Sequence, residues 1–145
     1  MRCPNVVFAL LLAVPPGAVA AEPATATQQA QAWLELLDSG RYAQAWQQTA
    51  ATVQRGTDLS RWSQAQIAAR GSGQPSCRKS LGLQRREAPT RVDAVFVTQF
   101  ADGRRIAEKV TLSAAEEPTV QAYRVGPPPA DPAARCSAAD KVRRP

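Results

Sequence analysis

The stretch VFVTQFADGRRIAEKVTL, residues 95–112, decides the fold. Apolar and polar residues alternate on both sides of Asp102-Gly103, a pattern typical of a β-hairpin. A two-residue Asp-Gly turn would mix apolar and charged side chains on each face of the sheet. A three-residue loop, 101–103, with Gly103 in the left-handed position separates them, so we expect that register. It places these apolar residues on one face: Val92, Phe96, Phe100, Ile106, Val110 and Leu112.

The chain before this hairpin has a helical pattern instead. Apolar residues recur at helical spacing in three segments, each followed by a glycine that is typical of a helix end. We therefore predict an α+β fold in which N-terminal helices pack on one face of a C-terminal antiparallel sheet of about four strands. The expected helices are residues 25–40, 41–56 and a shorter one that begins at Asp58 or Ser60, and the expected strands are 81–86, 91–101, 105–113 and 119–125.

Three segments divide the chain. Residues 1–21 have a positive start at Arg2, an apolar run and the small residues AVA, which is the pattern of a signal peptide cleaved near Ala20 or Ala21. Residues 25–125 form one domain, and residues 126–145 are rich in Pro, Ala and Arg, which indicates a disordered tail. We therefore expect a periplasmic or secreted protein with no transmembrane segment in the mature chain.

The composition excludes several kinds of chemistry. The chain has no histidine among its 145 residues, which excludes Ser-His-Asp and Cys-His catalysis and ordinary zinc sites. It has neither a CxxC motif nor a Gly-rich phosphate loop. We therefore assign no catalytic residue, no metal and no cofactor. The formal charge of +6 includes the leader and the basic tail, so the domain itself is only mildly basic, and we expect no nucleic acid as a partner.

Cys77 and Cys136 remain as a pair once the leader is removed. In an oxidising compartment an even pair favours a disulfide, which would pin the tail to the loop before the first strand. The neighbouring cations Arg78 and Lys79 would instead favour an activated thiolate if Cys77 stayed reduced and exposed. Free or intermolecular thiols are the third alternative.

The other candidate site residues are basic or aromatic, with one carboxylate. A ligand-binding basic patch would use Arg78, Lys79, Arg85 and Arg86 with Arg91, Arg104 and Arg105, unless these cations only protect exposed strands from edge pairing. Tryptophans 33, 46 and 62 would line a pocket or, more simply, fill the core. Glu108 shares the apolar face in the expected register, so it lies either near a sheet edge or in a pocket with a raised pKa. The other carboxylates, among them Asp38 and Asp58, are expected to cap helices or face solvent.

The order of these segments resembles a known family. AWLELLDSGRYAQAWQQTA is followed by LSRWSQAQIAAR, then by the Leu-Gly-x-x-x-Arg step in LGLQRR, the hairpin and a last strand with Tyr123. Together they resemble domain of unknown function 4019, DUF4019, a family of small exported bacterial proteins. The resemblance implies no activity, ligand or catalytic residue. By analogy we expect a cystatin-like or NTF2-like architecture.

These observations favour a non-catalytic periplasmic module that binds an unknown protein or a small ligand. One alternative is a small hydrolase or isomerase that uses Glu108 in a pocket between helices and sheet. Another is a binder of anionic envelope surfaces through the basic patch.

Overall fold

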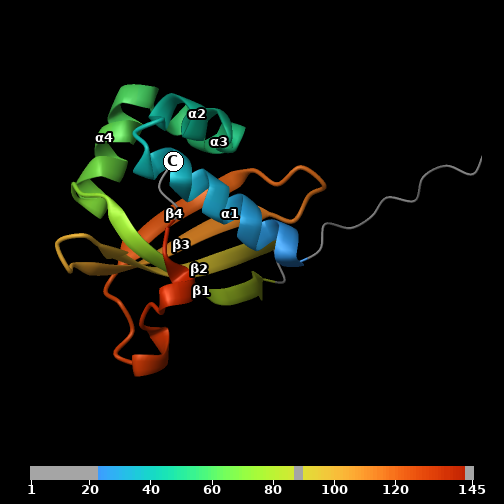
Figure 1. Ribbon diagram of the computed structural model, residues 1–145. Helices are drawn as coiled ribbons and strands as arrows, with labels where there is room; N and C mark the ends of the chain where they lie inside the picture. The colour runs from blue at the N-terminus through green and yellow to red at the C-terminus, as the bar shows by residue number, and fades with distance from the viewer. Residues whose placement is uncertain (1–22, 87–89, 143–145) are drawn as a thin grey trace, which may run out of the picture.

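The computed structural model describes residues 23–86 and 90–142. Four α-helices come first in the chain and lie on one face of a four-stranded antiparallel sheet (Figure 1), which is the predicted α+β arrangement. The predicted signal peptide lies outside the described residues. Within the described ranges, no helix is both long and apolar enough to cross a membrane.

The second predicted helix is interrupted. Residues 48–50 leave the helical path because they pair with the start of the last strand: the Val120 amide donates to the Gln48 carbonyl (2.9 Å) and the Ala50 amide donates to the Val120 carbonyl (2.8 Å). The helical pattern on both sides of this break is therefore divided between two short helices. The four helices are α1 (Pro23–Asp38), α2 (Tyr42–Gln47), α3 (Ala51–Gly56) and α4 (Leu59–Arg70).

The sheet follows chain order, with the central hairpin in the predicted register. Phe96 pairs with Glu108, and the Phe100 amide donates to the Arg104 carbonyl across a three-residue loop (2.8 Å). Gly103 in this loop has a φ of 85°, which side chains disfavour and glycine accepts. The strands are β1 (Pro75–Arg86), β2 (Arg91–Phe100), β3 (Arg105–Ser113) and β4 (Val120–Gly126), in the order β1-β2-β3-β4.

Strand β1 begins at Pro75, six residues before the predicted start. Its two register shifts against β2 lie between Pro75 and Cys77 and between Ser80 and Gly82, where Gly82 takes a φ of 106°. These bulges break the alternation of side chains along the strand, so a strict period of two did not reveal its first half.

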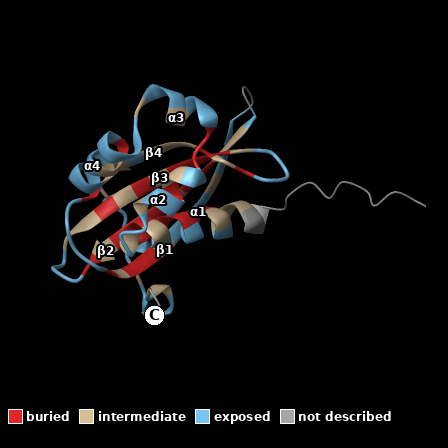
Figure 2. Cartoon of the chain, turned by 90° about the horizontal axis from the view of Figure 1, so that it is seen from above, coloured by how far each residue is buried: buried red, intermediate tan, exposed pale blue. Residues whose placement is uncertain are grey.

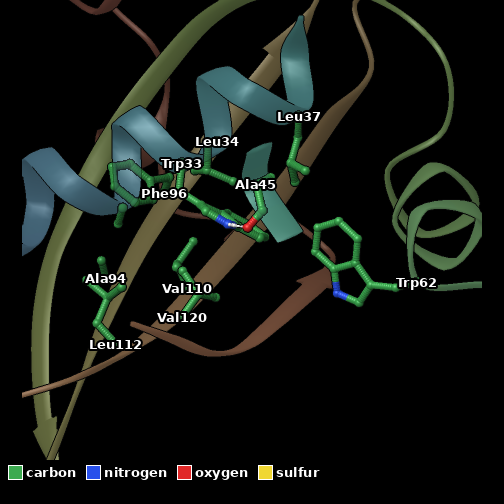
Figure 3. Packing of buried hydrophobic residues seen from close by; sticks show 11 residues of the cluster. Trp33, Leu34, Leu37, Ala45, Trp62, Ala94, Phe96, Val110, Leu112 and Val120 are labelled. Carbon is green, nitrogen blue, oxygen red and sulfur yellow. Dashed lines mark hydrogen bonds between the residues drawn. The ribbon is translucent and has the colours of Figure 1, made fainter. Parts of the chain in front are cut away.

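The core lies between α1 and the sheet. Trp33 is fully buried, and its indole nitrogen donates to the Ala45 carbonyl of α2 at 3.0 Å (Figure 3). This bond satisfies the only polar group of the ring, so the whole indole can be buried without an unpaired donor. The strands contribute mainly Ala94, Phe96, Val110 and Leu112.

Burial falls off toward the helices farthest from the sheet. Figure 2 shows buried residues concentrated along the strands and α1, while α3 and α4 are largely exposed. The opposite side of the sheet, which we call the outer face, carries none of the α-helices of the described residues (Figure 1).

The segment after β4 does not match the prediction of a disordered tail. It follows a defined path as far as Val142, with short 3-10 helices at Pro132–Ala134 and Ala138–Asp140, and it projects on the side of the sheet away from the helices (Figure 1). A disulfide and two backbone contacts to Lys79 hold it, and Ala134 is buried. Such tertiary contacts can order a segment whose composition alone suggests disorder.

Candidate functional site

Glu108, the sequence's best single candidate, lies in the middle of the sheet on the face covered by the helices. Its side chain is 0% exposed, and β3 is an interior strand, so the residue is not near a sheet edge. The predicted register places it opposite Phe96 among apolar neighbours, as expected. A carboxylate in such surroundings needs compensating charges and hydrogen bonds.

Both carboxylate oxygens of Glu108 have two donors each. Oε1 accepts from Arg70 Nε at 2.9 Å and from the Tyr123 hydroxyl at 2.6 Å. Oε2 accepts from Arg78 Nη2 at 3.3 Å and from the Thr98 hydroxyl. A carboxylate offers about four acceptor positions, so these donors use its whole capacity.

The two arginines share a second carboxylate, Asp38. Arg78 donates from Nη1 to Asp38 Oδ2 at 2.8 Å and from Nη2 to Oδ1 at 3.0 Å, and Arg70 Nη2 also donates to Oδ1. Arg78 Nε donates to the Thr98 hydroxyl at 3.1 Å. We call this group the charge cluster: Asp38, Arg70, Arg78, Thr98, Glu108 and Tyr123.

The charge cluster joins the helices to the sheet. Asp38 is the last residue of α1 and Arg70 the last of α4, while the other members come from the four strands. A cation in the last turn of α4 also interacts favourably with the helix dipole. Two guanidinium groups and two carboxylates cancel, so the buried cluster has no net charge.

The electrostatics keep Glu108 ionised. Burial by itself raises the pKa of its carboxyl, but the adjacent Arg78 and Arg70, with hydrogen bonds from Thr98 and Tyr123, bring that pKa below its ordinary value. Burial and the Glu108 carboxylate raise the pKa of the Tyr123 hydroxyl, which therefore stays protonated and remains a donor. The expectation of a raised pKa at Glu108 is wrong, because the sequence did not reveal the two guanidinium groups.

The structure does not bring together Arg78, Lys79, Arg85 and Arg86, the four residues predicted to bind a ligand, as one set of free cations. Arg78 is buried in the charge cluster, and Lys79 donates to the tail carbonyls of Ala133 (2.6 Å) and Arg135 (3.3 Å). Arg86 Nε donates to the buried carboxylate of Asp93 at 2.9 Å. Arg85 and Arg86 are both exposed, but Arg86 pairs with Asp93, so only Arg85 is both exposed and without an ion-pair partner among the described residues.

The cations of the hairpin tip are also engaged or covered. Arg104 lies over the Phe100 ring, 4.1 Å from its centroid, and donates to the carbonyls of Arg70 and Ser72. Arg105 lies on the outer face, where its Nε and Nη2 are buried and have no partner among the described residues. Neither residue adds to a patch with Arg85.

The tryptophans pack with each other as core residues. Trp33 and Trp62 are buried, and Trp46 is half-buried with its ring centroid 5.3 Å from that of Trp62. Trp33 also meets the Tyr123 ring edge-on at 5.3 Å, which joins the aromatic core to the charge cluster.

Cys77 and Cys136 form a disulfide that closes a 59-residue separation. Cys77 is buried within β1, rather than in the loop before it, so the bond ties the tail directly to the sheet. An isolated bridge between Cys77 and Lys141 adds to this attachment. Paired in this way, Cys77 has no thiol to activate.

Four members of the charge cluster were missed in the sequence: Asp38, Arg70, Thr98 and Tyr123. Asp38 was expected to cap a helix or face solvent, whereas Asp58 caps α4 as predicted and accepts from the Arg61 amide at 2.9 Å. The useful signal was Glu108 itself, because a carboxylate on an apolar face requires cations nearby. In the described part of the chain, no three His, Cys, Asp or Glu side chains are arranged to hold a metal ion.

A family model matches residues 29–124 of the chain and is described as a protein of unknown function, DUF4019. The chain belongs to the DUF4019 family. Comparisons with curated proteins and with solved structures gave no match. The Leu-Gly-x-x-x-Arg step, on which the resemblance partly rested, has a physical basis here: Gly82 adopts the positive φ of the β1 bulge, and Arg86 pairs with Asp93.

Proposed function

We propose that this DUF4019 protein is a non-catalytic binding module that works outside the cytoplasm. The observation that carries the proposal is the state of Glu108, which is fully buried and whose oxygens are occupied by four donors. A general acid or base must reach a substrate proton and exchange it near the working pH. A buried carboxylate with a lowered pKa is unsuited to that task. The alternative of a small hydrolase or isomerase therefore has less support.

The charge cluster fits a structural role that a binding module needs. It connects the ends of α1 and α4 to all four strands, which fixes these helices on one face, while none of the described α-helices covers the outer face. Buried ionic networks are not strong sources of stability, but they can specify one arrangement of the elements around them. A rigid scaffold of this kind positions a surface for a partner.

The proposal of an exported protein is supported by two independent features. Residues 1–21 have the pattern of a signal peptide, and Cys77 is bonded to Cys136, a type of bond that persists mainly in oxidising compartments. The full chain should be expressed in a Gram-negative host and the recovered protein analysed by intact mass. We expect a chain cleaved near Ala20 or Ala21 whose thiols react only after reduction. A full-length product with free thiols would contradict export.

Binding can be tested by site-specific photo-crosslinking in the same host. A photoreactive residue would replace Arg124 on the outer face, Gln44 on α2 or Leu81 on β1, all of which are exposed. We expect one of these positions to give a single adduct of defined mass, and the other two positions to give none. Failure to obtain an adduct from any position, in chains that are exported and folded, would contradict a protein-binding module.

A further inference from the structure

The outer face of the sheet concentrates positive charge. Alternation along the paired strands directs six cations and one carboxylate, Asp93, to this face. The other carboxylate of the four strands is Glu108, on the helix side. The six cations are Lys79, Arg86, Arg91, Arg105, Lys109 and Arg124.

Asp93 neutralises only part of this charge. It is 0% exposed and accepts from Arg86 Nε at 2.9 Å and from the Thr111 hydroxyl at 2.6 Å, while Lys109 Nζ lies 3.7 Å away. Burial alone would raise the pKa of Asp93, but these neighbours lower it, so the carboxylate stays ionised and occupied. Lys79 is engaged with the tail.

Three cations of this face lack an acidic partner among the described residues: Arg91, Arg105 and Arg124. Arg124 is exposed, Arg91 is half-exposed, and Arg105 keeps two buried nitrogen atoms without a hydrogen bond. Like charges gathered on one face repel each other unless an anion lies near them.

These three cations and Lys109 form a stripe along β3. Arg91 lies beside Ser113, Lys109 lies beside Arg124, and Arg105 is four residues beyond Lys109 on the same strand. At about 3.3 Å per residue, successive levels of the stripe are about 13 Å apart. One phosphate or sulfate is too small to bridge two levels. An extended chain with repeated negative charges can span the level of Arg91 and the level of Lys109 and Arg124, which keep exposed surface.

We propose that this stripe binds an extended acidic segment of a partner protein, an inference that rests on the proposed binding function. Charge complementarity favours a polyanion. No Phe, Tyr or Trp points outward from the four described strands, so the face lacks the aromatic rings on which nucleic-acid bases stack. The C-terminal segment projects from the same side of the sheet and prevents a flat lipid surface from lying against it (Figure 1).

Direct binding tests the proposal with three probes: a fluorescent glutamate octapeptide, a single-stranded thymidine oligonucleotide, and vesicles of phosphatidylglycerol with phosphatidylcholine. The variant Arg91→Gln with Arg124→Gln removes two cations from the stripe. The matched control, Arg41→Gln with Arg55→Gln, removes the same charge from exposed positions beside α2 and on α3. All chains are oxidised, and their melting temperatures are compared first.

We expect the stripe variant to bind the octapeptide at least about fivefold more weakly, and the control less than about twofold, with the difference shrinking as salt is raised. Equal weakening by both pairs would overturn the proposal, as would a loss confined to the oligonucleotide or the vesicles. No binding of the octapeptide by the parent chain would also overturn it. If the peptide-binding test fails but photo-crosslinking gives an adduct, the binding role of the stripe is refuted and the proposed binding function stands.

Discussion

Replacing Glu108 by glutamine preserves the shape of the side chain but removes one negative charge from the charge cluster. Each Glu108 oxygen accepts a hydrogen bond from an arginine, Arg70 on Oε1 and Arg78 on Oε2. An arginine cannot act as an acceptor. Whichever way the new amide is turned, its NH2 group therefore faces an arginine donor, and one guanidinium loses its bond to residue 108.

The magnitude follows from the burial of this site. Glu108 is 0% exposed, and Arg70 and Arg78 keep only 6% and 2% of their side-chain surface exposed. Removing one partner of a buried ion pair costs about 3–5 kcal/mol because an uncompensated charge stays behind. For a domain of this size, such a loss lowers the melting temperature by about 10–20 °C.

The assay is denaturant unfolding followed by tryptophan fluorescence and by far-ultraviolet circular dichroism. Glu35→Gln is the matched control, since Glu35 is exposed on α1 and its side chain accepts one long hydrogen bond, from Gln31 Nε2 at 3.4 Å. We expect the free energy of unfolding to fall by about 3–5 kcal/mol for Glu108→Gln and by less than about 0.5 kcal/mol for the control. A loss below about 1 kcal/mol for Glu108→Gln would refute the reasoning, because the cluster would then not depend on this charge.

Three further outcomes are expected. Because the pKa of Glu108 is lowered in the folded protein, its contribution to stability is present above the ordinary pKa of 4.5 and is lost as the pH falls through the lower, folded-state pKa. Between neutral pH and acid, Glu108→Gln should therefore lose less stability than the parent chain. Equal slopes of unfolding free energy against pH for the two proteins would count against this. Replacing Cys136 by serine removes the disulfide between residues 59 positions apart and should lower the free energy of unfolding by roughly 2–4 kcal/mol. Amide exchange in the segment after β4 should become faster. Unchanged exchange there would show that the bond to Cys77 does not order this segment. Asp58→Ala removes the α4 cap and should lower the free energy of unfolding by about 1 kcal/mol, measured by thermal melting. An unchanged melting temperature would contradict this prediction.

Local chemistry explains why much of the fold could be predicted. The hairpin register follows from the requirement that Phe96 and Val110 face the core, and Gly103 supplies the backbone conformation that the loop needs. Helix ends were likewise marked by nearby signals, such as Asp58 before α4. These features depend on residues close together in sequence.

The features that were missed depend on contacts between distant residues. Val120 pairs with Gln48 and Ala50 and breaks the second helix, which no helical pattern can announce. Arg78 was predicted to join a basic patch or to protect a strand edge, whereas its partners Asp38 and Glu108 are 40 and 30 residues away in the sequence. The place of Glu108 on an apolar face could have signalled a cationic partner, but several arginines were available and spacing did not select among them.

The central claim is that Glu108 is an ionised structural anchor and does not transfer protons. The most direct measurement is a titration of the Glu108 side-chain carboxyl by carbon-13 NMR on the folded, oxidised protein. The account predicts no ionisation step at or above pH 4.5, with any transition below that value and coupled to loss of structure. A transition above that value in the intact fold would contradict it and would return Glu108 to the candidates for acid–base chemistry.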